Sequence, residues 1–242
     1  MTPKPDWIPQ EGFITELVHN LSRELCNPVT SIKTAVKLLE LPNLKPSQRQ
    51  HYLQVISEEC DRQNRLIQSL VELTTLGDMK NAEPVPIVIP DFIPAIVSTF
   101  QPLAQEKGVM LAYSVPAEMP LLWSVPVLVR KIIVQLLDNA LRATPVNGRI
   151  WVTAHCPDPT HLHLEIRDTG IGIPAADLPR IFERFYRVRD HKQGGIGMGL
   201  TLVQQLVYFL GGQIRVQSRV GQGTTFVVEL PLLEPKEPKQ VT

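Results

Sequence analysis

The sequence is poor in cysteine, in charge of one sign and in long apolar runs. Its three cysteines (Cys26, Cys60 and Cys156) are widely spaced and lack C-x-x-C spacing, which excludes a disulfide framework, argues against a zinc site and fits a reducing cytoplasm. Lysine plus arginine equals aspartate plus glutamate at 24 each, so no net charge attracts nucleic acid. Without an apolar run of about eighteen residues or a signal-like N-terminus, we expect a cytoplasmic protein that does not insert into a membrane.

The first third of the chain has a helical periodicity instead. Apolar residues recur in steps of three and four from Ile14 to Leu39, which predicts one amphipathic helix, bent at Pro28. The prolines of "LPNLKP" end this helix, and a second apolar seam follows in residues 53–70. Because two helices cannot close a core alone, we predict that an antiparallel helical hairpin over residues 13–78 pairs with a second copy into a four-helix bundle.

The sequence changes character after this hairpin. The Pro-rich residues 79–86 indicate a linker, and residues 87–233 then mix helical and strand patterns. The expected helices and strands of this part are helices 91–106, 125–143 and 199–210 and strands 109–115, 149–156, 161–168, 213–218 and 224–230. This order predicts an α+β domain with helices on one face of a largely antiparallel sheet. Residues 1–12 form a lead-in, and the charged, Pro-rich residues 234–242 are expected to be disordered.

Three stretches of the second domain have the residues of a nucleotide site. "LLDNALRATP" places Asn139 on an apolar helix, "RDTGIGIP" follows a strand with an acid and two glycines, and "GGIGMGL" opens the last helix. A Gly-rich segment that enters a helix offers free N–H groups and the positive end of the helix dipole to a phosphate. Each glycine alone is explained by a turn, and no hydrophobic strand precedes them as a Rossmann fingerprint requires. The order and spacing of all three favour nucleotide binding.

Together these stretches closely resemble the ATP-binding domain of two-component sensor histidine kinases, a GHKL-type α/β sandwich shared with gyrase and MutL-type ATPases. The N box matches "QLLDNALRAT", the G1 box "DTGIGI", the F box "IFERFYR" and the G2 box "GGIGMGL". The helical hairpin resembles the family's dimerisation and phosphoacceptor domain, so the resemblance covers nearly the whole chain. It implies ATP and Mg²⁺ as ligands, a homodimer or a heterodimer with another histidine kinase, and a response-regulator receiver domain as partner. Because about a dozen residues precede the first helix, we expect the input to come from a separate sensor protein or from sequence missing here.

The resemblance also implies roles for individual residues. Asn139 would hold Mg²⁺ through a hard amide oxygen, and Asp168 would accept a hydrogen bond from the adenine amino group, since an ionised carboxylate is purely an acceptor. Gln135 stands where the family usually has an asparagine. The glycines would let the backbone approach the base or shape the lid, and Arg142, Tyr186 and Arg187 are candidates for phosphate contacts. The implied nucleotide-binding positions besides Asn139 and Asp168 are Gln135, Arg142, Gly170, Gly172, Tyr186, Arg187, Gly195, Gly197 and Gly199.

The segment "SRELCNPVTSI" departs from the family at the phosphoacceptor position, its second residue. Arg23 stands where the resemblance places the acceptor histidine, next to Glu24 as the expected base. A guanidinium stays protonated and offers no nucleophile near neutral pH, so Arg23 should not accept phosphate. His19, one helical turn earlier, is a displaced acceptor in an alternative reading. Asn27 stands where the family orients a water against a phosphorylated response regulator.

The leading interpretation is therefore a histidine-kinase-type transmitter that binds ATP·Mg²⁺ and couples to a response regulator. Three functional classes stay open: a kinase that uses His19 or phosphorylates a partner's histidine in a mixed dimer, a pseudokinase scaffold, and a response-regulator phosphatase that uses Asn27. A GHKL ATPase outside signalling is a more remote alternative.

Overall fold

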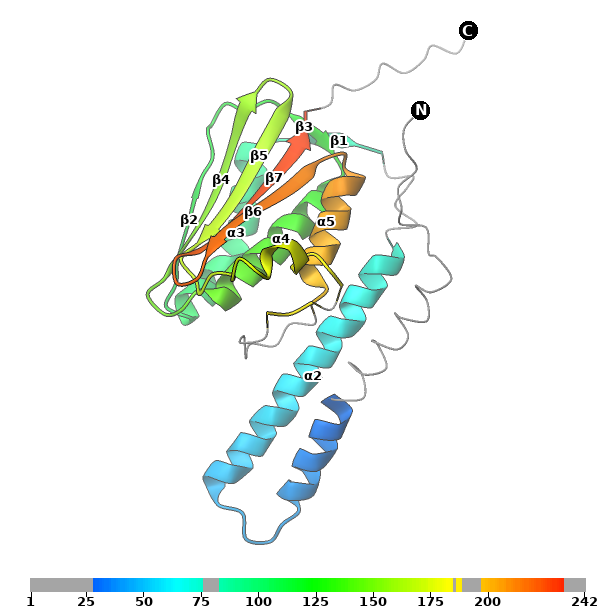
Figure 1. Cartoon of the computed structure of the whole chain (residues 1–242), viewed down its shortest axis with the longest axis vertical. Coiled ribbons are helices and arrows are strands. Elements are labelled where there is room, and N and C mark those ends of the chain that lie inside the picture. Colours follow the sequence, from blue (N-terminus) through cyan, green and yellow to red (C-terminus); the bar gives the residue numbers. More distant parts are fainter. Residues whose placement is uncertain (1–27, 76–82, 185, 189–196, 233–242) are drawn as a thin grey trace. The chain divides into compact units, whose positions relative to one another are not determined.

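The computed structural model describes residues 28–75, 83–184, 186–188 and 197–232 of the chain. They belong to two compact units, a helical one and a larger one of mixed helices and strands (Figure 1). The mixed unit is α+β, as predicted.

The helical unit is a hairpin of two helices. The first is helical through residues 28–39, and α2 spans Pro46–Thr75. Pro46 suits the first turn of a helix because it has no N–H to leave unpaired. The backbone N–H of Lys45 donates to Gln48 Oε1 at 3.1 Å, which caps the start of α2. The predicted break between two helices is confirmed, whereas the predicted segment from Ile14 to the bend at Pro28 precedes the described residues.

The mixed unit is built on a five-stranded sheet with strand order β2-β4-β5-β7-β6. Strands β2 and β4 are parallel, and the other three neighbouring pairs are antiparallel, as the sequence predicted for most of the sheet. The strands are β2 (Met110–Ser114), β4 (Arg149–Asp158), β5 (His161–Asp168), β6 (Gln213–Arg219) and β7 (Gly223–Pro231).

Helices α3 (Ile89–Glu106), α4 (Pro126–Ala143) and α5 (Gly199–Phe209) cover one face of this sheet (Figure 1). Each agrees with a predicted helix to within two residues. The core lies between the helices and the sheet, where burial of apolar surface stabilises the fold. Side chains that are 0% exposed there include Ile96, Ile132, Leu136, Ile150 and Val152.

Two short strands were not predicted. β1 (Val85–Ile87) and β3 (Leu122–Ser124) form a separate antiparallel pair. β1 begins inside the segment expected to be a linker. Three residues are too short for a period-two pattern to stand out, and prolines in the surrounding sequence favoured a loop.

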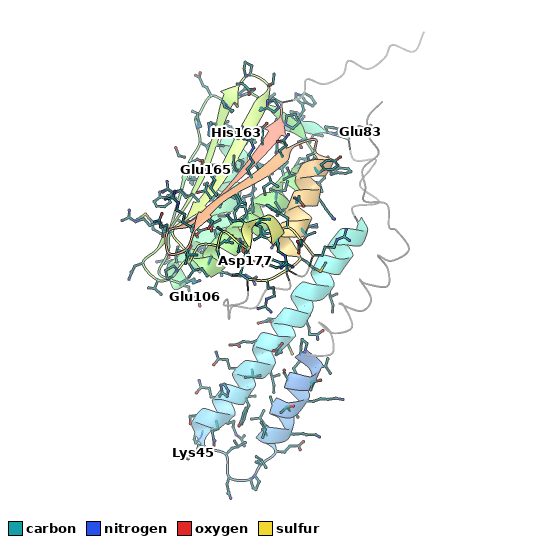
Figure 2. The ribbon with its side chains drawn as sticks, in the orientation of Figure 1. Lys45, Glu83, Glu106, His163, Glu165 and Asp177 are labelled. Carbon is teal, nitrogen blue, oxygen red and sulfur yellow. The ribbon has the colours of Figure 1, made fainter. Side chains whose placement is uncertain are left out.

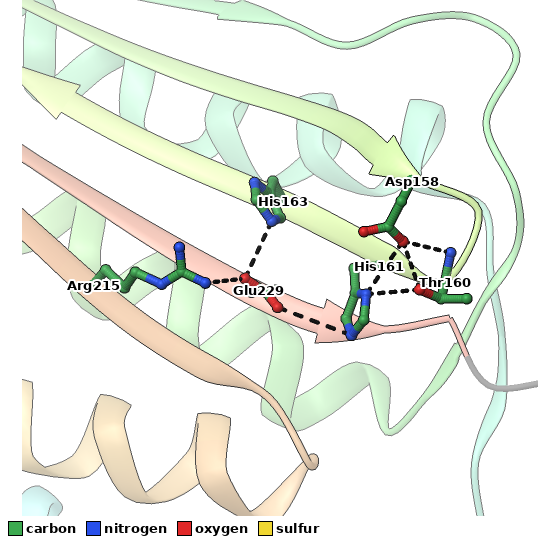
Figure 3. A network of polar contacts seen from close by, with 6 residues as sticks. All are labelled: Asp158, Thr160, His161, His163, Arg215 and Glu229. Atoms are coloured by element: carbon green, nitrogen blue, oxygen red, sulfur yellow. Dashed lines mark hydrogen bonds and ion pairs between the residues drawn. The ribbon is translucent and has the colours of Figure 1, made fainter.

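The face of the sheet opposite the helices carries a polar network. His163 lies on β5 (Figure 2), and its Nε2 is 3.2 Å from the carboxylate of Glu229 on β7. Arg215 pairs with the same carboxylate at 2.6 Å, and His161 lies between Glu229 and Asp158 (Figure 3). The residues that the structure describes contain no group of three or more side chains that could hold a metal ion. Through the pairs of His163 and Arg215 with Glu229, the network links β5, β6 and β7.

Candidate nucleotide-binding site

The candidate site is built around a buried carboxylate at the end of β5. Asp168 is 3% exposed. Its Oδ1 accepts hydrogen bonds from the backbone N–H groups of Gly170 at 2.8 Å and Thr224 at 3.2 Å. Within the described part of the chain, Oδ2 accepts no hydrogen bond. The carboxylate is therefore held by one oxygen and leaves the other for a ligand.

Two opposing effects act on the charge of Asp168. Burial raises the pKa of its carboxyl group, and the two backbone hydrogen bonds lower it by a smaller amount. The oxygen that accepts neither backbone hydrogen bond, Oδ2, can accept one from a ligand that donates. An exocyclic amino group is such a donor.

The loop after Asp168 passes close to two other segments. A Cβ at Gly170 would lie 2.6 Å from the carbonyl oxygen of Ala143 at the end of α4. Gly172 has φ +70°, and a Cβ there would lie 2.0 Å from the carbonyl oxygen of Arg219. Both positions therefore require glycine because the loop packs on backbone, a reason that the sequence interpretation did not include.

The polar face of α4 carries three of the predicted residues. Gln135, Asn139 and Arg142 follow one another at helical spacing, and all three are partly exposed. A Cβ at Gly199 would lie 2.3 Å from the side-chain nitrogen of Gln135, so this face meets the N-terminus of α5. Arg142 pairs with Asp138 at 2.6 Å.

Tyr186 is held by its own segment. Its hydroxyl donates to Asp177, which raises the pKa of Tyr186. Arg180, in the short 3₁₀ helix Leu178–Arg180, lies over the ring with its guanidinium carbon 4.3 Å from the ring centroid. The expected phosphate contact would require the Tyr186 hydroxyl to leave Asp177. Arg187 lies at the surface.

The remaining predicted residues lie mostly outside the described residues. Gly197 is described and has φ +75°, a conformation that favours glycine. The predicted site residues outside the described ranges are His19, Arg23, Glu24, Asn27 and Gly195.

Sequence reasoning missed two residues that support the site. Thr224 donates to Asp168 from β7, and Lys107 Nζ donates to the carbonyl oxygens of Leu141 at 2.5 Å and Arg142 at 3.1 Å at the end of α4. Burial, then the nearby charge of Arg142, lowers the pKa of Lys107. The hairpin stretch "VGQGTT" could have pointed to Thr224, whereas no local pattern marks Lys107.

Two family models match the chain. The model of the His Kinase A (phospho-acceptor) domain covers residues 13–78. The model of the histidine kinase-, DNA gyrase B- and HSP90-like ATPases covers residues 124–234, which include Asn139 and Asp168. The chain is a transmitter module of the two-component histidine kinases.

Relatives and solved structures agree with this assignment. The transmitter module is 30% identical over 237 residues to the adaptive-response sensory kinase SasA of Synechocystis, covering 95% of this chain and 62% of SasA. It is 29% identical to the sensor histidine kinase WalK of Bacillus subtilis, covering 92% of this chain and 37% of WalK. The module thus spans about three fifths of the SasA sequence.

Among solved structures, full-length ShkA in complex with AMPPNP matches with a TM-score of 0.65 at 26% identity, covering 92% of this chain and 47% of ShkA. The histidine kinase ThkA, in complex with the response regulator protein TrrA, matches with a TM-score of 0.75 at 19% identity. This match covers 92% of this chain and 63% of ThkA. The ThkA match shows a shared fold. No helix in the described part of the transmitter module has the length and apolarity needed to span a bilayer.

Proposed function

We propose that this transmitter module binds ATP·Mg²⁺, couples to the receiver domain of a response regulator, and does not phosphorylate itself at position 23. The observation that carries the nucleotide part is Asp168, a buried carboxylate with one oxygen left for a donor. The AMPPNP complex of ShkA supports it, and the ThkA–TrrA complex supports a receiver domain as partner.

The residues on α4 fit a magnesium-bound triphosphate. Mg²⁺ commonly takes one or two protein ligands and fills its other positions with phosphate oxygens and water. Asn139 would supply an amide oxygen from the partly exposed face of α4, and Gln135 and Arg142 lie on the same face. When bound, the metal would neutralise charge on the phosphates. The described residues contain no competing cluster of acidic ligands.

The helical unit supports pairing with a second transmitter. Val29, Val36, Leu53 and Ile67, all on the predicted apolar seams or adjoining them, are 43–54% exposed in the single hairpin. Apolar side chains at helical spacing gain stability when a partner covers them. This favours a homodimer, or a heterodimer with another histidine kinase.

The acceptor position is where this chain departs from an ordinary kinase. Arg23 has no lone pair that can attack the terminal phosphate of ATP, whereas a neutral histidine has one. Glu24 would remain as a base beside it. The unmutated protein should therefore bind ATP·Mg²⁺ yet acquire little acid-labile, base-stable phosphate.

Labelling with γ-³²P-ATP tests this proposal. We expect Arg23→His to gain acid-labile phosphate, and His19→Ala to remove any trace from the unmutated protein. Strong labelling of the unmutated protein would contradict the proposal, and its loss in His19→Ala would identify His19 as the acceptor. If Arg23→His binds ATP without labelling, the scaffold and phosphatase alternatives lead. Loss of phosphate from a labelled response regulator, abolished by Asn27→Ala, would then identify the phosphatase.

A further inference from the structure

Ser218, near the end of β6, joins the two loops that surround Asp168. The backbone N–H of Ile173 donates to Ser218 Oγ at 2.8 Å. Ser218 Oγ donates to the carbonyl oxygen of Gly223 at 2.9 Å and lies 2.8 Å from Thr224 Oγ1. One hydroxyl thus contacts both the loop after β5 and the start of β7.

The directions of these bonds follow from counting hydrogens. A serine hydroxyl has one hydrogen and two lone pairs. The carbonyl of Gly223 can only accept, so it takes the Ser218 hydrogen, and Thr224 must then donate its hydroxyl hydrogen to Ser218. With the N–H of Ile173, all three bonding positions of Ser218 are filled.

Thr224, which is bonded to Ser218, also contacts the carboxylate of Asp168. The backbone N–H of Thr224, the residue paired with Ser218 across the β6–β7 hairpin, donates to Asp168 Oδ1. A Cβ at Gly223 would lie 1.9 Å from the carbonyl oxygen of Asp168, so the two backbones are in close contact. A second link, from the N–H of Gly221 to the carbonyl of Ile171 at 2.8 Å, holds the same two loops together.

We propose that Ser218 is a positioning residue that fixes the orientation of Asp168 and thereby sets the selectivity of the site for an adenine base. The proposal rests on the proposed nucleotide-binding function. Ser218 acts through backbone geometry, because without its hydroxyl the N–H of Ile173 and the hydroxyl of Thr224 lose their shared hydrogen-bond partner. The position of Thr224 relative to Asp168 is then less well defined.

The test compares ATP with inosine triphosphate (ITP), which carries a carbonyl oxygen in place of the adenine amino group. Calorimetry on the full chain with Mg²⁺ should show that Ser218→Ala weakens ATP binding about tenfold, the effect of about one lost hydrogen bond. ITP lacks the donor that Asp168 reads, so its affinity should change little. The ratio of the two affinities should therefore fall about tenfold, and Ser218→Thr should restore it.

Two further variants complete the design. Gln217→Ala removes an exposed side chain from the neighbouring position of β6 and should leave both affinities unchanged. Thr224→Val keeps the backbone N–H that donates to Asp168 but removes the hydroxyl that contacts Ser218. It should therefore lower the ratio of ATP to ITP affinity by a smaller factor. This variant replaces Ser218→Ala in the test if Ser218→Ala does not fold. An unchanged ratio of ATP to ITP affinity, whether both affinities fall equally or neither falls, would overturn the inference while leaving the proposed function intact. Failure of the unmutated protein to bind ATP would overturn both.

Discussion

Replacing Asp168 by asparagine should separate the nucleotide affinity of the site from the stability of the fold. Asparagine keeps an oxygen that can accept the N–H groups of Gly170 and Thr224. Its amide nitrogen would take the place of Oδ2 and present hydrogens to the adenine amino group, which is itself a donor. We therefore expect Asp168→Asn to retain its fold and lose most of its affinity for ATP.

The stability of the ligand-free protein should respond in the opposite direction. Burial, the largest effect on Asp168, raises its pKa above the ordinary value of 3.8. A carboxyl group with a raised pKa contributes stability that is present below its unfolded pKa and is lost as the pH rises through its folded pKa. At pH 8 the carboxylate is buried with its charge. Asp168→Asn removes that penalty, so its melting temperature without ligand should equal or exceed that of the unmutated protein.

Thermal unfolding with and without nucleotide measures both effects. ATP·Mg²⁺ at 100 times its Kd stabilises a folded protein by about 2.7 kcal/mol, which raises the melting temperature of a domain of about 150 residues by roughly 5–10 °C. This shift should vanish in Asp168→Asn. Glu165→Gln, the same chemical change on the open face of β5 (Figure 2), is the matched control and should keep the shift.

Two outcomes would refute the reasoning about Asp168. A full ATP-induced shift in Asp168→Asn would mean that the carboxylate does not bind the base. A melting temperature without ligand that falls by several degrees would mean that the charge of Asp168 is needed to hold its loop. In that case the backbone hydrogen bonds outweigh burial.

Two other predictions concern the loops and the helices. In chemical denaturation, Gly172→Ala should lower the free energy of unfolding by about 3 kcal/mol or more, because its φ is +70° and its Cβ would lie 2.0 Å from the carbonyl oxygen of Arg219. Gly221→Ala should cost about 1 kcal/mol, because its φ is +73° but its Cβ would meet no atom within 4 Å. Equal losses in the two variants would contradict the steric argument. In light scattering, a fragment of residues 1–78 should be a dimer, and a fragment of residues 83–233, which keeps β1, should be a monomer. A monomeric 1–78 fragment would count against the four-helix bundle.

The three helices and the five strands of the main sheet followed from local patterns, whereas the short strands β1 and β3 did not. The apolar spacing of α4 and the alternation in β4 and β5 are properties of neighbouring residues, and the structure confirms them. The four motifs identified the family because their order along the chain is itself sequence information. The identity of Arg23 is likewise a matter of sequence. Its chemical consequence follows from the guanidinium, whatever surrounds it.

The surroundings of Asp168 were decided by tertiary structure. Thr224 is 56 residues away along the chain, and the Ser218–Ile173 hydrogen bond joins residues 45 apart. Neither contact leaves a periodic trace, because it exists only when β5, β6 and β7 pair in one register. The bond between Tyr186 and Asp177 also lay beyond sequence reasoning, which had directed Tyr186 at a phosphate. Sequence determined which chemical groups the site contains, whereas packing determined which oxygen of Asp168 remains for the ligand.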